Sequence, residues 1–258
     1  NLAVKALSKI TLIFDAFYDV EKLHKDGNIY ATNLLNMWAK AEWFTSKTNI
    51  QEALKVIVFK VDGETNTDDL SPAQEAWSRS DIPLHAKSIF LNKIPNIFKI
   101  IDELKLKKLP IAFVGDIVGT GSSRKSAINS LQWHFGHKIP FVPNKNSGGI
   151  ILGTKIAPIF FNTAEDSGAL PIECDVSKLK TGDEIEINLQ EKNILDKNGK
   201  VIINFKLNPI TILDEFRAGG RIPLIIGKGL TEKARFALKL DSSDKFINII
   251  SQDDANKK

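Results

Sequence analysis

The spacing of apolar residues changes near Leu54, so two kinds of structure are expected along this chain. Upstream, apolar residues recur at steps of three and four, as at Ile10, Ile13 and Phe17, which is typical of amphipathic helices. Residues 54–61 are instead rich in β-branched side chains and are expected to form a strand. The sequence therefore predicts a helical segment followed by a mixed region of strands and helices.

Residues 2–46 predict two helices joined by a turn at Lys25-Asp26-Gly27-Asn28. Two short antiparallel helices cannot bury both of their faces alone, so this hairpin is expected to end a helical array. A helical cap on the following domain is the alternative. The chain opens on Asn1 rather than on methionine, and we therefore expect a segment of a longer protein or a processed product.

The remaining pattern predicts one compact domain of mixed α and β structure over roughly residues 52–238. A polar tail over residues 241–258 is expected to be frayed or to act as a linker. The elements expected within the domain are a polar loop at 62–69, helical turns over 83–106 interrupted near Pro95, a strand at 110–114, a helix at 126–135, strands at 184–189 and 201–207, a hairpin turn at Asn198-Gly199, and a helix at 231–238.

The composition excludes several classes of protein. Lys and Arg total 35 and Asp and Glu total 31 among 258 residues, and this interspersed net charge of +4 does not by itself predict nucleic-acid binding. Cys174 is the single cysteine, which excludes a disulfide framework and a metal motif made of cysteines alone. No apolar run approaches the roughly 18–20 residues of a membrane span. A cytoplasmic setting is therefore expected.

The clearest local motif is Gly115-Asp116-Ile117-Val118-Gly119-Thr120-Gly121-Ser122-Ser123-Arg124-Lys125-Ser126, between an apolar strand and a helix. Glycines let the backbone approach a ligand closely, and the N–H groups at a helix start point toward it. Ser122 and Ser123 are expected to cap the helix, while Arg124 offers a fork for a carboxylate or phosphate. The spacing fits neither a P-loop nor a dinucleotide fingerprint. The motif predicts a small-anion site, and a capped helix start with a solvated arginine is the alternative.

A second polar loop, residues 65–73, is followed by Trp77-Ser78-Arg79. Taken alone, this loop predicts a turn with a surface arginine. If it faces the glycine-rich loop, Arg79 supplies a second cation for the same anion. Two arginines with two hydroxyls around one pocket suit a di- or tricarboxylate.

Three segments together resemble the swivel domain of the aconitase family. Thr67-Asp68-Asp69-Leu70-Ser71-Pro72-Ala73 with Arg79 is similar to that family's Thr-Asp-His-Ile-Ser-x-Ala…Arg stretch. Gly119-x-Gly121-Ser122-Ser123-Arg124 is similar to its Gly-Ser-Gly-Ser-Ser-Arg loop, and residues 159–172 resemble a later element. Residues 63–73, 76–79 and 218–227 further resemble the bacterial aconitase B branch, so the similarity covers essentially the whole chain.

The resemblance implies a mixed α/β fold with three parts. Residues 1–50 are expected to be the last helices of a HEAT-like α domain, and residues 51–238 a swivel-type β/β/α domain. Residues 239–258 are expected to be a polar linker toward a catalytic core.

The resemblance also implies a reaction of the tricarboxylic acid cycle. Aconitases interconvert citrate and isocitrate through cis-aconitate, and the B branch also acts on 2-methylisocitrate. Transferred by motif, Ser122 is the base that removes the carbon-bound proton, and Ser122, Ser123, Arg124 and Arg79 bind the substrate carboxylates. The implied partners are the tricarboxylate and the remaining catalytic domains of the same protein.

The family's [4Fe-4S] cluster, a Lewis acid with one open iron site, is held by cysteines of the catalytic core. This sequence has no matching segment, and Cys174 lies in a pattern typical of a strand core. We therefore expect that the full-length enzyme contains the cluster, whereas this chain alone binds none and has no aconitase activity.

Two departures and two alternative functions remain open. Asp69 stands where many aconitases carry histidine, and Lys125-Ser126 replaces a common Glu-His; both are expected to be features of the branch. One alternative is a separate small subunit of an isopropylmalate-isomerase-type hydro-lyase, against which the attached helical hairpin argues. The other is a module that binds protein or mRNA, for which the charge pattern gives no independent support.

Overall fold

The computed structural model describes residues 2–11, 13–47, 53–139 and 142–246. Contacts between residues divide the chain into two units, one formed by 1–49 with 222–258 and the other by 50–221. The boundaries of these units lie near residue 50 and at Arg221. Most of the last helix belongs to the first unit, where it packs with the N-terminal helices.

The first unit is helical, as the apolar spacing of residues 2–46 predicts. Its core is formed by buried residues such as Phe17, Leu35 and Trp38. The predicted turn after Lys25 is present, and the Asn28 side chain caps the following helix by accepting hydrogen bonds from two backbone N–H groups. The helices of this unit are α1 (Leu2–Leu7), η1 (Phe14–Ala16), α2 (Phe17–Lys25), α3 (Ile29–Ala39), α4 (Glu42–Thr45) and α11 (Arg221–Ala237), whose first residue belongs to the other unit.

Helix α11 begins ten residues before the predicted start at 231, so that prediction is wrong at its N-terminal boundary. Gly227 lies inside the helix, where a Cβ would stand 2.3 Å from the Trp43 ring. The Trp43 indole N–H donates to Thr231 Oγ1 at 3.0 Å. Glycine in this helix therefore allows close packing against an aromatic ring and does not end the element.

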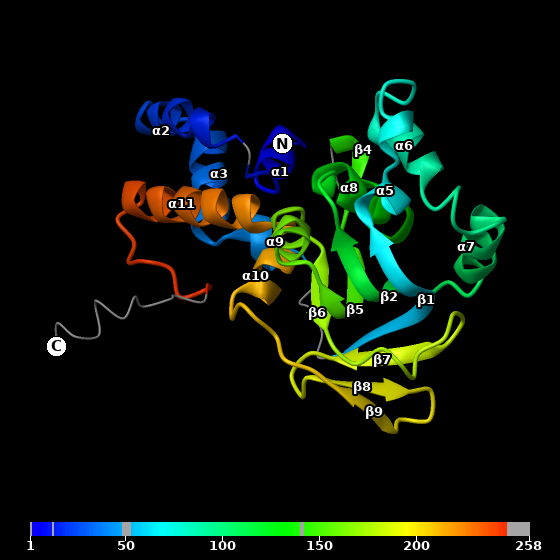
Figure 1. The fold of residues 1–258 in the computed structure, drawn as a ribbon. Helices are drawn as coiled ribbons and strands as arrows, with labels where there is room; N and C mark the ends of the chain where they lie inside the picture. The colour runs from blue at the N-terminus through cyan, green and yellow to red at the C-terminus, as the bar shows by residue number, and fades with distance from the viewer. Residues whose placement is uncertain (1, 12, 48–52, 140–141, 247–258) are drawn as a thin grey trace. The chain divides into compact units, whose positions relative to one another are not determined.

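The second unit is built on a seven-stranded mixed sheet (Figure 1). Strands β6, β5, β2 and β1 are parallel neighbours, and β7, β8 and β9 continue the sheet antiparallel from β1. The strands, in spatial order, are β6 (Leu170–Glu173), β5 (Ile150–Ile156), β2 (Ile111–Thr120), β1 (Ala53–Asn66), β7 (Glu184–Asn188), β8 (Asn193–Asp196) and β9 (Val201–Asn204); β3 (His137–Ile139) and β4 (Val142–Ser147) form a separate pair.

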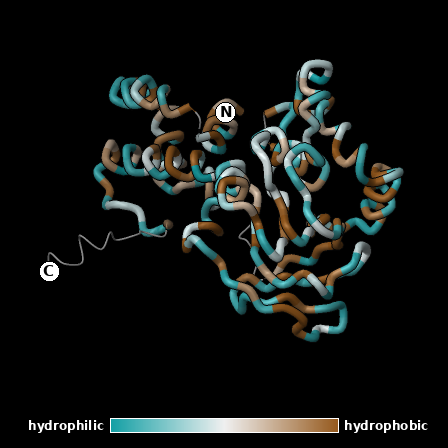
Figure 2. Tube along the Cα trace, in the orientation of Figure 1, coloured by the Kyte–Doolittle hydropathy of each residue, from teal (hydrophilic) through white to brown (hydrophobic). Residues whose placement is uncertain are grey.

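Each face of the large sheet carries its own core. Ile57 and Phe59 of β1 pack with helices α7, α8 and α9, while Val56 and Val58 face the opposite core, which includes α10. Hydrophobic segments follow the central strands (Figure 2). The helices of this unit are α5 (Thr67–Leu70), η2 (Ala73–Glu75), α6 (Ile82–His85), η3 (Ala86–Ser88), α7 (Ile97–Lys105), α8 (Arg124–Phe135), α9 (Pro158–Asp166) and α10 (Ile212–Ala218).

The mixed α/β class predicted from the sequence is confirmed, and the element boundaries differ in part. The predicted loop at 62–69 is wrong, because β1 continues to Asn66 and α5 begins at Thr67. The predicted hairpin at Asn198-Gly199 joins β8 to β9, with Gly199 at a φ of 78°. Across the described ranges, no helix is both long and apolar enough to span a membrane.

Candidate functional site

The two polar loops singled out in the sequence follow neighbouring parallel strands. Strands β1 and β2 are parallel neighbours, with Asn66 opposite Thr120 at their carboxyl ends. Because parallel strands end at the same edge of a sheet, the loops that follow them lie side by side there. This edge is where ligands commonly bind in open α/β sheets.

The first loop is a short helix with a complete cap. The Asn66 side chain accepts from the Asp69 N–H at 2.8 Å, and the Asp69 carboxylate accepts from the Asn66 N–H at 3.0 Å, which is a capping box. The same carboxylate lies 2.8 Å from Lys93 Nζ. Aspartate at position 69 thus holds the loop together, which gives this departure from the aconitase pattern a structural role.

The second loop depends on two glycines with positive φ, 82° at Gly119 and 104° at Gly121. A Cβ at Gly119 would lie 2.1 Å from the ring of Phe160 on α9. A Cβ at Gly121 would lie 2.4 Å from the side-chain oxygen of Thr67. These positions therefore let the loop fit closely between α9 and the first loop.

Thr67 joins the two loops. Its hydroxyl oxygen accepts a hydrogen bond from the Ser123 N–H at 3.3 Å, and the side chain is buried. Ser123 occupies the cap position of α8, but its side chain makes no capping hydrogen bond. The prediction that serine side chains cap this helix is therefore wrong for Ser123. The side chain that accepts at this helix start is Thr67 of the neighbouring loop, which binds the Ser123 N–H.

Ser122 and Arg124 lie at the open side of the loop. Ser122 is exposed and Arg124 is half-buried. The Arg124 guanidinium lies 3.4 Å from the Gly121 carbonyl oxygen, and within the described part of the chain it forms no ion pair with an acidic side chain. A hydroxyl, a guanidinium and the start of a twelve-residue helix thus stand together, an arrangement that favours an anion.

Arg79 lies on the segment between η2 and α6 and does not touch Ser122, Ser123 or Arg124 among the contacts in this structure. Its Nε lies 2.7 Å from Glu75 Oε2. Arg79 does line a cavity of ≈ 160 Å³ whose lining also includes Ser126 in the first turn of α8. The structure therefore brings Arg79 to the same helix but leaves its guanidinium paired with Glu75.

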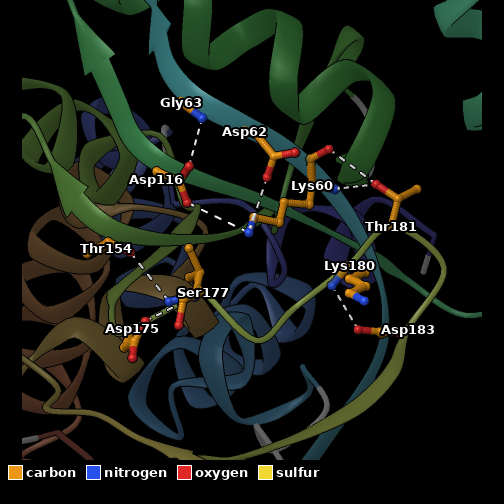
Figure 3. Close-up of polar contacts among 11 residues, drawn as sticks. Lys60, Asp62, Gly63, Asp116, Thr154, Asp175, Ser177, Lys180, Thr181 and Asp183 are labelled. Atoms are coloured by element: carbon orange, nitrogen blue, oxygen red, sulfur yellow. Dashed lines mark hydrogen bonds and ion pairs between the residues drawn. The ribbon is translucent and has the colours of Figure 1, made fainter.

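A network around Lys60 joins the middle of β1 to Asp116 of β2 (Figure 3). Lys60 Nζ lies 3.2 Å from Asp62 Oδ1 and 3.8 Å from Asp116 Oδ1. Asp116 also accepts from the Gly63 N–H at 2.7 Å, next to the register shift between Val61 and Glu64. Sequence reasoning missed this network, although Asp116 stands inside the glycine-rich motif.

The described residues do not supply ligands for an iron–sulfur cluster, because no three of their His, Cys, Asp or Glu side chains lie together as metal ligands. Cys174 is buried just after β6, and burial raises the pKa of its thiol to about 12. A thiol held protonated in this way is a poor metal ligand.

Similarity to known proteins covers both units. Residues 56–258 match the family described as "Aconitate hydratase 2 N-terminus", and residues 1–44 match "Aconitate B N-terminal domain". Aconitate hydratase B of Synechocystis is 58% identical over 257 residues, which is 100% of this chain and 30% of that protein. The chain thus spans about 30% of the length of this curated relative.

Two 3-isopropylmalate dehydratase proteins are similar to part of this chain. The 3-isopropylmalate dehydratase small subunit 2 of Archaeoglobus fulgidus is 24% identical over 167 residues, 65% of this chain and 91% of that protein. A solved structure of 3-isopropylmalate dehydratase from Methanocaldococcus jannaschii is 20% identical with a TM-score of 0.53, covering 71% of this chain and 99% of that one. This structural likeness supports the swivel-type fold.

Proposed function

The chain belongs to the family of aconitate hydratase 2 (aconitase B) N-terminal segments, and on this premise we propose that it supplies part of the substrate site of a hydro-lyase. The proposed reaction interconverts citrate and isocitrate through cis-aconitate, with 2-methylisocitrate as a further substrate. The observation that carries the proposal is the close fit of the Thr67 loop against Gly121 and Ser123.

In this proposal Ser122 is the base. Its deprotonated Oγ accepts the proton from the substrate carbon, the C–H electron pair forms the double bond, and an acid proposed to lie in the catalytic core protonates the departing hydroxyl so that it leaves as water. A serine hydroxyl is a poor base at its ordinary pKa, so it needs nearby positive charge. The start of α8 and the guanidinium of Arg124 support this role, because both favour the deprotonated oxygen.

The substrate carboxylates are proposed to bind Ser123, Arg124 and Arg79. Arg124 is available for this role, since its guanidinium contacts only a backbone carbonyl among the described residues. Arg79 must exchange its Glu75 partner for the substrate, and the cavity that it shares with Ser126 gives it a path toward α8. Each charged contact contributes on the order of 2–5 kcal/mol when its loss leaves a partner unpaired.

The remaining parts of the proposal concern the whole protein. We propose that other domains of the same protein hold the [4Fe-4S] cluster, that residues 1–50 end a HEAT-like domain, and that residues 239–258 lead toward the catalytic core. We also propose a cytoplasmic setting. A separate small subunit is the second candidate, favoured by the match of 65% of this chain to 91% of the Archaeoglobus small subunit. Binding of mRNA has no observation in its favour.

A titration of this chain with citrate and tricarballylate, followed by amide NMR, tests the proposed substrate site. The largest shifts are expected at residues 121–126, and Arg124→Gln is expected to weaken binding by more than about tenfold. Lys125→Gln, at the next and exposed position, is the matched control and retains most of the affinity. Shifts of equal size in both variants, or none at residues 121–126 at millimolar ligand, contradict the proposal.

A further inference from the structure

A group of ionisable side chains lies where the end of α9 meets the turn between α10 and α11. Arg221 Nη2 lies 2.8 Å from Glu165 Oε2, and Arg221 Nε lies 3.4 Å from Glu215 Oε2. Arg221 Nη1 lies 3.4 Å from Asp166 Oδ1. The side chains of Glu165 and Glu215 are only 1% and 6% exposed. One guanidinium therefore faces two buried carboxyl groups and a third near the surface.

The charges of this group do not balance when every carboxyl is ionised. The charged groups that face Glu165 are Glu215 from α10, Arg221 from the start of α11 and Asp166 from α9 itself. Glu165 Oε1 has no hydrogen-bond partner among the described residues. Burial and the Glu215 charge raise the pKa of Glu165 to about 7, although Arg221 opposes the shift. A proton on Glu165 lowers the excess negative charge and leaves one guanidinium between one buried carboxylate and one near the surface.

The backbone beneath these side chains is tightly fitted. A Cβ at Gly168 would lie 2.5 Å from the Gly219 carbonyl carbon. A Cβ at Gly220 would lie 2.3 Å from the backbone carbonyl oxygen of Asp166. The N–H groups of Gly219 and Gly220 both donate to the Glu215 carbonyl, at 3.0 and 2.8 Å. Repulsion between the carboxylates therefore acts on a close-packed backbone contact between the Gly219–Gly220 turn and the end of α9.

We propose that Glu165, Glu215 and Arg221 form a pH-sensitive clasp, which holds the Gly219–Gly220 turn against the end of α9 while Glu165 is protonated and loosens when Glu165 loses its proton. The clasp also bears on the candidate site, because Phe160 at the other end of α9 packs against Gly119. It does not depend on the proposed hydro-lyase activity, so either can fail without the other.

Carboxyl NMR titration and amide hydrogen exchange on the whole chain test the clasp. The Glu165 carboxyl is expected to titrate near pH 7 instead of 4.5. If opening exposes this group to water, the protection factors of the Gly219 and Gly220 amides fall as the pH rises from 4.5 to about 7, by up to about tenfold per pH unit. A Glu165 midpoint near 4.5, or protection that does not change with pH, overturns the proposal.

Glu165→Gln distinguishes the effect of the proton from the effect of side-chain packing, because glutamine has the shape of the protonated carboxyl but does not titrate. In this variant the protection of both amides is expected to become independent of pH. Glu103→Gln, at an exposed carboxyl on α7, is the matched control and keeps the wild-type pH dependence. Wild-type pH dependence in Glu165→Gln overturns the proposal, and if that variant does not fold, the wild-type titration decides alone.

Discussion

The hydroxyl oxygen of Thr67 accepts a hydrogen bond from the backbone N–H of Ser123 at 3.3 Å, across 56 positions of sequence. The same oxygen occupies the space beside Gly121 that a Cβ would need. One buried hydroxyl thus fixes the distance between the two loops of the candidate site. The geometry around Ser122 therefore depends on a residue that follows a different strand.

Thr67→Val keeps the shape of the side chain and removes the acceptor. The free energy of unfolding is expected to fall by about 1 kcal/mol, because the Ser123 N–H loses its partner. Urea unfolding of the chain measures this change. Thr67→Ser retains the hydroxyl and is expected to keep the Ser123 amide shift of the wild type. A serine variant with the same altered amide shift as the valine variant argues against the hydrogen bond.

Gly119→Ala is expected to be strongly destabilising. A non-glycine residue in left-handed backbone costs about 1–2 kcal/mol, and overpacking against Phe160 adds about 1–3 kcal/mol. Gly182→Ala is the matched control, because Gly182 also has positive φ, at 93°, but has open space around it. Thermal unfolding of the two variants compares their losses of stability. Equal losses would show that the Phe160 side chain moves aside at little cost, which contradicts the prediction.

Cys174 is expected to be inert in the folded chain. The thiol is buried and its pKa is raised to about 12, so almost no thiolate is present at pH 8. Iodoacetamide should label the native chain far more slowly than the urea-unfolded chain. Labelling of the native chain at the rate of a free thiol contradicts this environment.

His134 is expected to make the chain sensitive to acid. Its ring Nε2 lies 2.8 Å from the Ala86 carbonyl oxygen, and burial lowers its pKa below the ordinary 6.5. The unfolded chain therefore binds the proton more tightly, and this contribution to stability is present above pH 6.5 and is lost as the pH falls through the folded-state value. Proton NMR of the ring gives the midpoint. In His134→Gln the acid-dependent loss should shrink, and a ring midpoint above 6.5 reverses the expectation.

The sequence predicts the helix–strand order well where the apolar pattern is long. The strand from Leu54 and the helix ending at Phe135 are present. Strands β5 and β8 escaped prediction, whereas β9, as short as β8, was predicted within the longer apolar pattern of residues 201–207. Strand β6 adjoins Cys174, whose surroundings the sequence indicates as a strand core. Helix α11 was predicted too short, since Gly227 suggests an interruption and only its packing against Trp43 explains it.

The candidate site was predicted in part. The motif around Ser122 correctly indicates a loop before a helix, and the parallel pairing of β1 with β2 brings the Thr67 loop beside it. The hydrogen bond from the Ser123 N–H to the Thr67 hydroxyl was not predicted, because a hydrogen bond to a backbone N–H leaves no pattern in the sequence. The Glu75 pairing of Arg79 also escaped notice, although their four-residue spacing is a recognisable helical signal.

The most direct test of the proposed function is a complementation assay. This chain is mixed with a cluster-reconstituted aconitase B core that lacks its own N-terminal segment, and cis-aconitate formation is followed by ultraviolet absorbance. The wild-type chain is expected to restore activity, Ser122→Ala to lower it by about 10²–10⁴-fold, and Ser177→Ala, an exposed serine elsewhere, to leave it unchanged. Full activity with Ser122→Ala, or a stable complex with the wild-type chain that forms no cis-aconitate, contradicts the account.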